Sequence, residues 1–237
     1  MTIEIRDLPS WLQPLAASLQ DSDRRDQVVA LRPGVGGRSA AVLALLGQGE
    51  SGPEMLFIER GRTLRTHAGQ VALPGGAMDP EDADLAATAL REAYEETAVD
   101  RSGIEVLGCL PAVHVAVSGF DVTTVVGWWR TPSAVRVADP REVASVLVVP
   151  VAELTDPAHR VSVRHPSGYT GPAFQVAGVL IWGLTAYLVD GLLDLAGWQR
   201  PWDAERHIDI PARYLHDRHP AGRPGSPTRD TGGPDAH

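Results

Sequence analysis

A Gly-rich turn followed by a carboxylate-bearing helix constrains this chain more than any other part of its sequence. The turn reads Leu-Pro-Gly-Gly at residues 73–76, and strong helix formers predict the helix over 84–97, with Asp84 as its capping residue. An acid-rich connection joins the two. Because glycine has no side chain, such a turn lets the backbone pass close to a metal ion or a phosphate group.

The acids of this helix share one face. At about 100° per residue, Glu92, Glu95 and Glu96 stand three and four positions apart on the same side. On its own this pattern is typical of a solvated helix face, and the preceding turn shifts the balance towards a site. Three ionised carboxylates repel one another unless a cation lies between them. Oxygen ligands without His or Cys favour Mg2+ or Mn2+ over zinc, and Arg91 can pair with one carboxylate and hold its rotamer.

Apolar runs elsewhere in the chain predict strands and two further helices. The predicted strands lie at 40–46, 55–59, 104–107, 122–128 and 145–149, with a hairpin formed by 161–164 and 174–176. Helices are predicted over 8–20, with Ser10 as the N-cap, and over 185–196. The mixture indicates one α/β domain at 31–216, preceded by an N-terminal arm at 1–30. The tail at 217–237 has almost nothing to bury, and we expect it to be disordered.

Charge and cysteine content restrict the partners of the chain. The formal net charge is -9, so the average surface repels nucleic acid and anionic membranes, and we expect neither as a partner. Every basic residue other than His is Arg, so any phosphate clamp must use guanidinium groups. The single cysteine, Cys109, excludes an intramolecular disulfide and a Cys-based zinc site. No signal peptide or membrane span is evident, and we expect a cytoplasmic protein. The tryptophans at 128–129 and 182–198 could bury either a homodimer interface or a core.

The turn and helix together resemble the Nudix box. In that motif Gly, five residues, Glu and seven residues precede R-E-U-x-E-E-x-G-U, where U is aliphatic. Here the connection from Gly76 to Arg91 is one residue longer, Asp82 or Ala83 stands in place of the first Glu, and Ala98 replaces the late Gly. The three helix glutamates are all present. The resemblance implies a Nudix-type α/β/α sandwich with a central mixed sheet.

The segment before the box is similar to the signature of coenzyme A diphosphatases. That signature runs L-L-T-x-R-S and then L-R-x-H-x-G-Q-V-x-F-P-G-G. The matching residues are Arg60, Leu64, Arg65, His67, Gly69, Gln70, Val71 and the Pro-Gly-Gly at 74–76, whereas Gly61 and Leu73 depart from it. The similarity continues through 118–120, 122–127, 142–143 and 181–185, so it covers about residues 38–198. The subfamily also accepts the longer box with Asp and the late Ala.

The resemblance implies hydrolysis of coenzyme A or its derivatives to 3′,5′-ADP and 4′-phosphopantetheine, or the acyl form of the latter. Mg2+ or Mn2+ is the implied cofactor, and a small nucleotide is the implied partner. The expected metal site comprises Glu92 and Glu96 as principal ligands, Glu95 completing the cluster, and the Gly76 carbonyl. The expected catalytic residues are Glu95, Glu96, Arg91 and Glu142. The expected substrate-binding residues are Arg60, Arg65, His67 and Gly75. Arg62 is not fixed by the signature and is expected to be an exposed loop charge.

The sequence leaves the general base and the substrate open. The general base is either a box glutamate or Glu142, which precedes a predicted strand. The substrate could instead be another nucleoside diphosphate linked to a second group, such as ADP-ribose or a dinucleotide. A Nudix-fold module that binds a nucleotide without cleaving it is a further alternative. Such modules often lose box carboxylates, and this chain keeps three of them.

Overall fold

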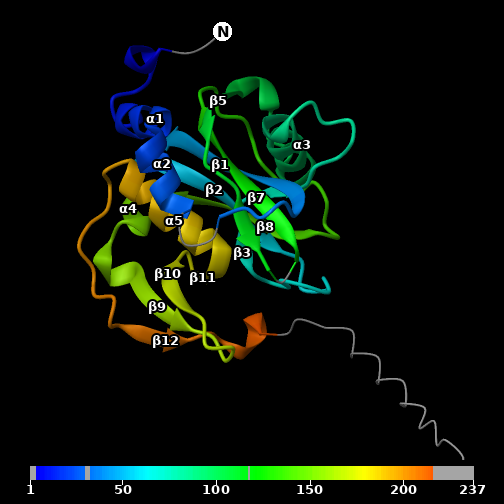
Figure 1. Ribbon diagram of the computed structural model, residues 1–237, viewed down its shortest axis with the longest axis vertical. Helices are drawn as coiled ribbons and strands as arrows, with labels where there is room; N and C mark the ends of the chain where they lie inside the picture. Colours follow the sequence, from blue (N-terminus) through cyan, green and yellow to red (C-terminus); the bar gives the residue numbers. More distant parts are fainter. Residues whose placement is uncertain (1–3, 30–32, 117, 216–237) are drawn as a thin grey trace, which may run out of the picture.

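A mixed sheet forms the centre of the computed structural model, which describes residues 4–29, 33–116 and 118–215 (Figure 1). Its strands are β1 (Arg38–Gly49), β2 (Gly52–Arg60), β3 (Val71–Ala72), β4 (Gly75–Ala77), β5 (Ile104–Cys109), β6 (Val113–Val115), β7 (Phe120–Trp129) and β8 (Val143–Pro150). The order is β3-β2-β1-β7-β5, with β4 paired to β1, β6 to β7 and β8 to β2. Strands β1 and β7 run parallel, whereas the other pairs in this sheet are antiparallel.

Helices cover both faces of this sheet. Alternate residues of β1 point to opposite sides, as strand geometry requires. On one side Leu43 packs with Ala89 and Ala93 of α3 (Leu85–Thr97). On the other side Leu46 joins a larger core with α1 (Gln13–Gln20) and α5 (Gly183–Leu195). Figure 1 shows α3 on one side of the sheet and α1 and α5 on the other. The predicted α/β/α sandwich is confirmed.

A second, smaller sheet lies beside α5 in Figure 1. It has the order β11-β10-β9-β12. Its strands are β9 (Arg160–Arg164), β10 (Thr170–Val176), β11 (Val179–Ile181) and β12 (His207–Asp209). Strands β9 and β10 pair antiparallel, which confirms the predicted hairpin, and β12 adds to β9 in parallel. Tyr214 is buried in the core of this sheet, so the segment after β12 is packed against it.

The remaining helices and turns of the described residues are short. They are α2 (Ser22–Val29), α4 (Val151–Leu154) and the 3-10 turns η1 (Ile5–Asp7), η2 (Arg101–Gly103), η3 (Pro157–His159) and η4 (Ala212–Tyr214).

The N-terminal region differs from the prediction in two respects. Helix α1 begins at Gln13 rather than at residue 8, and its N-cap Leu12 makes no side-chain cap bond, so Ser10 is not the cap. Instead, the Pro9 carbonyl accepts from the amides of Leu12 and Gln13, and this turn leads into the helix. The sequence prediction also missed α2, which the Asp21 carboxylate caps by accepting two backbone N–H bonds. The tail at 217–237 lies outside the described residues.

The sequence did not decide whether the tryptophans bury a homodimer interface or a core. In the structure, two of them contribute to the packing within the chain. Trp129 is 4% exposed beside α3, and Trp198 lies 5.9 Å from Trp11 between ring centroids. Within the described residues no helix has the length and apolar character that crossing a membrane requires.

Candidate active site

The Gly-rich turn sits directly beneath the helix glutamates. Strand β4 pairs with the first half of β1, and the Gly75 amide donates to Glu96 Oε2 at 2.9 Å. A Cβ on Gly75 would lie 2.3 Å from the Ala41 carbonyl oxygen, so no larger residue fits there. A Cβ on Gly76 would lie 2.4 Å from Glu92 Oε1. The two glycines therefore allow the backbone of β4 to approach both carboxylates.

Arg91 links the acids of the helix to those of the connection. Its Nε and Nη2 atoms donate to the two oxygens of Asp82 at 3.0 and 2.9 Å. Its Nη1 atom donates to Glu92 at 3.0 Å and to Glu95 at 3.2 Å, and Nη2 also donates to the Ala77 carbonyl at 3.1 Å. The bond from Arg91 holds the pKa of Asp82 well below its usual range.

Asp82 is a site residue whose role the sequence reasoning did not assign. It stands near the position of the first box acid, which was the available signal. Besides the pair with Arg91, its Oδ2 accepts from the Thr88 hydroxyl at 2.9 Å and from the Asp79 amide at 2.9 Å. Asp82 therefore anchors Arg91 against the start of α3.

The three glutamates differ in their exposure to solvent. Glu96 is 3% exposed, whereas the side chains of Glu92 and Glu95 are 17% and 53% exposed. Burial raises the pKa of Glu96 to about 8, and the negative charges of Glu92 and Glu142 act in the same direction. Burial is also the main reason why the pKa of Glu92 is raised. A solvated helix face would not show these shifts.

The donor set fits a hard divalent cation. The oxygens of Glu92 and Glu96, which lie together at the turn, are partly desolvated and disfavoured as anions, and a cation would relieve this repulsion. Among the described residues, no group of three or more His, Cys, Asp or Glu side chains is already arranged around one metal position. The Arg91 guanidinium bonds to Glu92 and Glu95, so these carboxylates are oriented by a protein cation.

Two residues from outside the box reach the glutamates. Glu142 precedes β8, and its carbonyl accepts from the Gly61 amide at 2.7 Å. The Glu142 charge raises the pKa of both Glu92 and Glu96, which places it near the pair. Arg60 ends β2, and its positive charge lowers the pKa of Glu96. The buried Nε of Arg60 has no hydrogen-bond partner in the part of the chain that is described.

The remaining predicted substrate residues lie in the segment Arg60–Gln70, which we call the arginine loop. Arg65 is exposed there, and Arg62 is 80% exposed with an ion pair to Glu59 at 3.3 Å. His67 has a φ of 56°, and its Nδ1 lies 3.1 Å from Gln70 Oε1. The charge of Arg60 thus acts on Glu96, whereas Arg65 and His67 lie further along the loop.

Gln70 connects the arginine loop to a distant part of the chain. Its Nε2 donates to the Tyr214 carbonyl at 3.2 Å, across 144 positions of sequence. Tyr214 was not among the predicted site residues, because no local sequence pattern connects it to the loop. The segment after β12 therefore supports the loop from outside.

Comparisons with known proteins agree with this geometry. The NUDIX domain profile matches residues 37–167. An uncharacterized Nudix hydrolase, NudL, of Citrobacter koseri is 40% identical over 185 residues, covering 73% of this chain and 93% of that protein. The NudL protein of Klebsiella pneumoniae strain 342 is 39% identical over 184 residues, covering 73% and 92%.

A solved structure supports the fold. The Nudix hydrolase RenU from M. smegmatis superposes with a TM-score of 0.50 at 19% identity, covering 72% of this chain and 92% of that chain. The profile match, the sequence relatives and the turn-and-helix geometry lead to one assignment. The chain belongs to the Nudix hydrolase family and is a hydrolase that acts on diphosphate bonds.

Proposed function

We propose that this Nudix hydrolase cleaves the diphosphate bond of coenzyme A or its acyl derivatives. The products are 3′,5′-ADP and 4′-phosphopantetheine or its acyl form, and the cofactor is Mg2+ or Mn2+. The upstream match from Arg60 to Gly76 supports this substrate class over other nucleoside diphosphates.

The observation that carries the proposal is the position of Arg60. Its guanidinium lies near the buried Glu96, and its Nε is buried without a hydrogen-bond partner among the described residues. An arginine guanidinium is a planar cation whose other N–H groups can pair with phosphate oxygens. The two ends of the arginine loop are joined, because the Arg60 amide donates to the Gln70 carbonyl at 2.9 Å just before β3. The charge that Arg60 exerts on Glu96 supports a site in which a phosphate-binding cation acts beside the metal-binding carboxylates.

The proposed roles follow from this arrangement. Glu92 and Glu96 hold the divalent cation, with Glu95 and the Gly76 carbonyl as further ligands. When bound, the cation neutralises diphosphate charge and lowers the pKa of a water molecule. Arg91 keeps Glu92 and Glu95 oriented through its fork on Asp82. Arg60, Arg65 and His67 bind phosphate groups, and the Gly75 amide fixes the Glu96 rotamer.

A substrate panel on the purified chain tests the proposal. We expect coenzyme A and acetyl-coenzyme A to release 3′,5′-ADP in Mg2+ or Mn2+, and a chelator to abolish the release. ADP-ribose and a diadenosine polyphosphate serve as competing substrates. Efficient cleavage of either competitor, without release of 3′,5′-ADP from coenzyme A, would contradict the assignment.

The general base is assigned to Glu142. Glu142 is exposed and its charge acts on both Glu92 and the buried Glu96, which supports its carboxylate as the acceptor of a proton from water at the site. We expect Glu142→Gln to reduce kcat about 100-fold, the lower end of the usual contribution of a general base. An unchanged rate at saturating substrate would remove Glu142 from this role and leave a box glutamate as the base.

A further inference from the structure

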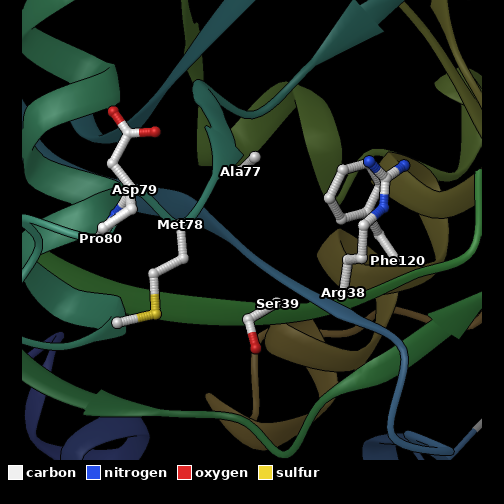
Figure 2. Close-up of a pocket in the computed structure, with 7 residues that line it drawn as sticks. All are labelled: Arg38, Ser39, Ala77, Met78, Asp79, Pro80 and Phe120. Atoms are coloured by element: carbon white, nitrogen blue, oxygen red, sulfur yellow. The ribbon is translucent and has the colours of Figure 1, made fainter.

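A cleft of about 490 Å³ opens beside the box on the side of the connection that follows β4. Figure 2 shows its walls. Arg38 and Phe120, at the starts of β1 and β7, form one side, and Met78 with the following Asp79 and Pro80 forms the other. The volume is within the range of about 300–1,000 Å³ that is typical of small-molecule sites.

The cleft adjoins the proposed metal site. Its wall residue Ala77 gives its carbonyl to Arg91 at 3.1 Å, and the Asp79 carboxylate lies 3.7 Å from the same Nη2 atom. The other end of the Arg91 guanidinium bonds to Glu92. One arginine side chain therefore spans the distance between the cleft and the box glutamates.

One wall of the cleft presents a flat cation. The Arg38 guanidinium lies over the Phe120 ring, with Cζ 4.1 Å from the ring centroid. The aromatic ring covers one face of the guanidinium, and a second flat ring can stack on the other face. Met78 is 37% exposed on the opposite wall and adds an apolar thioether to it, and in Figure 2 its side chain runs away from Arg38. In Figure 2 the Asp79 carboxylate points away from Arg38, so the charged group that faces the cleft is a cation.

The Arg38 wall is held in place by its own backbone. The Arg38 amide donates to the Gly119 carbonyl at 3.1 Å, and its Nη2 donates to the Ser118 carbonyl at 3.3 Å. Asp121 accepts the three amides of residues 35–37 at 2.7 to 2.9 Å and also faces His114 Nδ1 at 2.7 Å. The stacked pair is therefore formed without a ligand. This gives a role to Ser118-Gly119-Phe120, a segment that the hydrolytic mechanism leaves unused.

We infer that this cleft binds the nucleoside end of the substrate, with the purine base stacked on the Arg38 guanidinium and Met78 supplying apolar surface on the opposite wall. The inference rests on the proposed function, in that it assumes a substrate with a phosphorylated adenosine on one side of the diphosphate. Arg38 then acts on substrate recognition, and its cation also attracts the phosphates attached to the nucleoside.

Calorimetric titration of the full chain in Mg2+ tests this inference. The ligands are AMP, 3′,5′-ADP and 4′-phosphopantetheine, and none of them contains a diphosphate bond that can be cleaved. We expect Arg38→Ala to weaken binding of both nucleotides about tenfold or more, which is the usual range for loss of base stacking. Met78→Ala should weaken them by a smaller factor, and neither variant should change the affinity for 4′-phosphopantetheine.

Arg101→Ala is the matched control, because Arg101 also lies over an aromatic ring, that of Tyr94, at 5.3 Å on the surface of α3. It should bind all three ligands as the unaltered chain does. Unchanged nucleotide affinity in Arg38→Ala, or an equal loss for 4′-phosphopantetheine, would overturn the inference.

AMP separates this inference from the substrate proposal. If the unaltered chain fails to cleave coenzyme A but Arg38→Ala still binds AMP more weakly than the unaltered chain, the cleft assignment stands and the substrate proposal is wrong. If coenzyme A is cleaved and Arg38→Ala binds AMP normally, only the cleft assignment is wrong.

Discussion

The box and the arginine loop are stabilised in opposite ways. In the box, Arg91 bonds to Asp82 nine positions away and to Glu95 four positions away, so the carboxylates are oriented by contacts within one short segment. In the arginine loop, Arg62 and Arg65 are exposed, and the Gln70 side chain bonds to Tyr214 near the other end of the described chain. The proposed metal-binding half of the site is thus oriented mainly by contacts within about twenty positions, whereas the proposed substrate-binding half also depends on a contact across 144 positions.

This difference predicts different kinetic consequences. Groups that hold the metal should affect the chemical step, because they act on the reacting diphosphate itself. Groups in the arginine loop should affect substrate binding, because they bind phosphate oxygens equally in the ground state and in the transition state. This distinction would be contradicted if substitutions in the box and in the arginine loop changed kcat and KM in the same way.

The largest effect is expected for Glu96→Gln. Because burial already disfavours the Glu96 anion, the neutral amide should leave the metal-free fold intact. Loss of an outer-shell partner of a metal ligand costs about 10- to 100-fold, so loss of a ligand should reduce kcat by more than about 100-fold. Mg2+ should also no longer raise the Tm. Glu50→Gln, in the exposed turn between β1 and β2, is the control, and metal-dependent turnover by Glu96→Gln would refute the assignment.

A smaller loss is expected for Arg91→Lys, which retains the charge and removes the planar fork. We expect kcat to fall about 10- to 100-fold and the free energy of unfolding to fall by about 1–3 kcal/mol. Asp82→Asn should give the same kinetic defect, because Asp82 acts through Arg91. Steady-state kinetics and urea unfolding measure the two quantities. Normal kcat in both variants would mean that the ion pair between Arg91 and Asp82 has no part in turnover.

The arginine loop should respond in KM. Arg60→Ala removes a charge-assisted bond to phosphate, and we expect KM to rise about 10- to 100-fold with little change in kcat. Arg62→Ala is the matched control, since that side chain is 80% exposed and pairs with Glu59. Equal increases for the two variants would indicate a general charge effect, and a loss confined to kcat in Arg60→Ala would break the comparison.

The smallest effect concerns the end of the box helix. Ala98 adopts a left-handed conformation with a φ of 55°, which glycine accepts without strain. Ala98→Gly should raise the free energy of unfolding by about 1 kcal/mol and leave the kinetics unchanged. Ala87→Gly inside the same helix should lower it by about 0.5–1 kcal/mol. A destabilised Ala98→Gly would show that Ala98 is not strained.

Local patterns explain which parts of the molecule could be predicted. The Asp84 cap is confirmed, because its carboxylate accepts from the Ala87 amide at 2.8 Å, as the sequence pattern indicated. Helix spacing likewise predicted that Glu92, Glu95 and Glu96 share one face, of which Glu92 and Glu95 bond to Arg91 and Glu96 accepts from the Gly75 amide. Strand β12 was missed because its three residues pair with β9, more than 40 positions earlier. The approach of Arg60 to Glu96 depends on strand order in the sheet, which residue types alone do not reveal.

Strand β1 sets the separation between the proposed metal turn and the proposed nucleoside cleft. Val42 is opposite Gly75 of the metal turn, and Arg38 lies four residues earlier on the same strand. At about 3.3 Å per residue, about 13 Å of extended strand therefore separates the turn from Arg38. Inserting one residue between Arg38 and Val42 would lengthen this stretch of strand by about 3.3 Å and would turn the Arg38 side chain to the opposite face of the sheet. If the cleft binds the nucleoside, this single extended segment fixes the distance between nucleoside and diphosphate that a substrate must span.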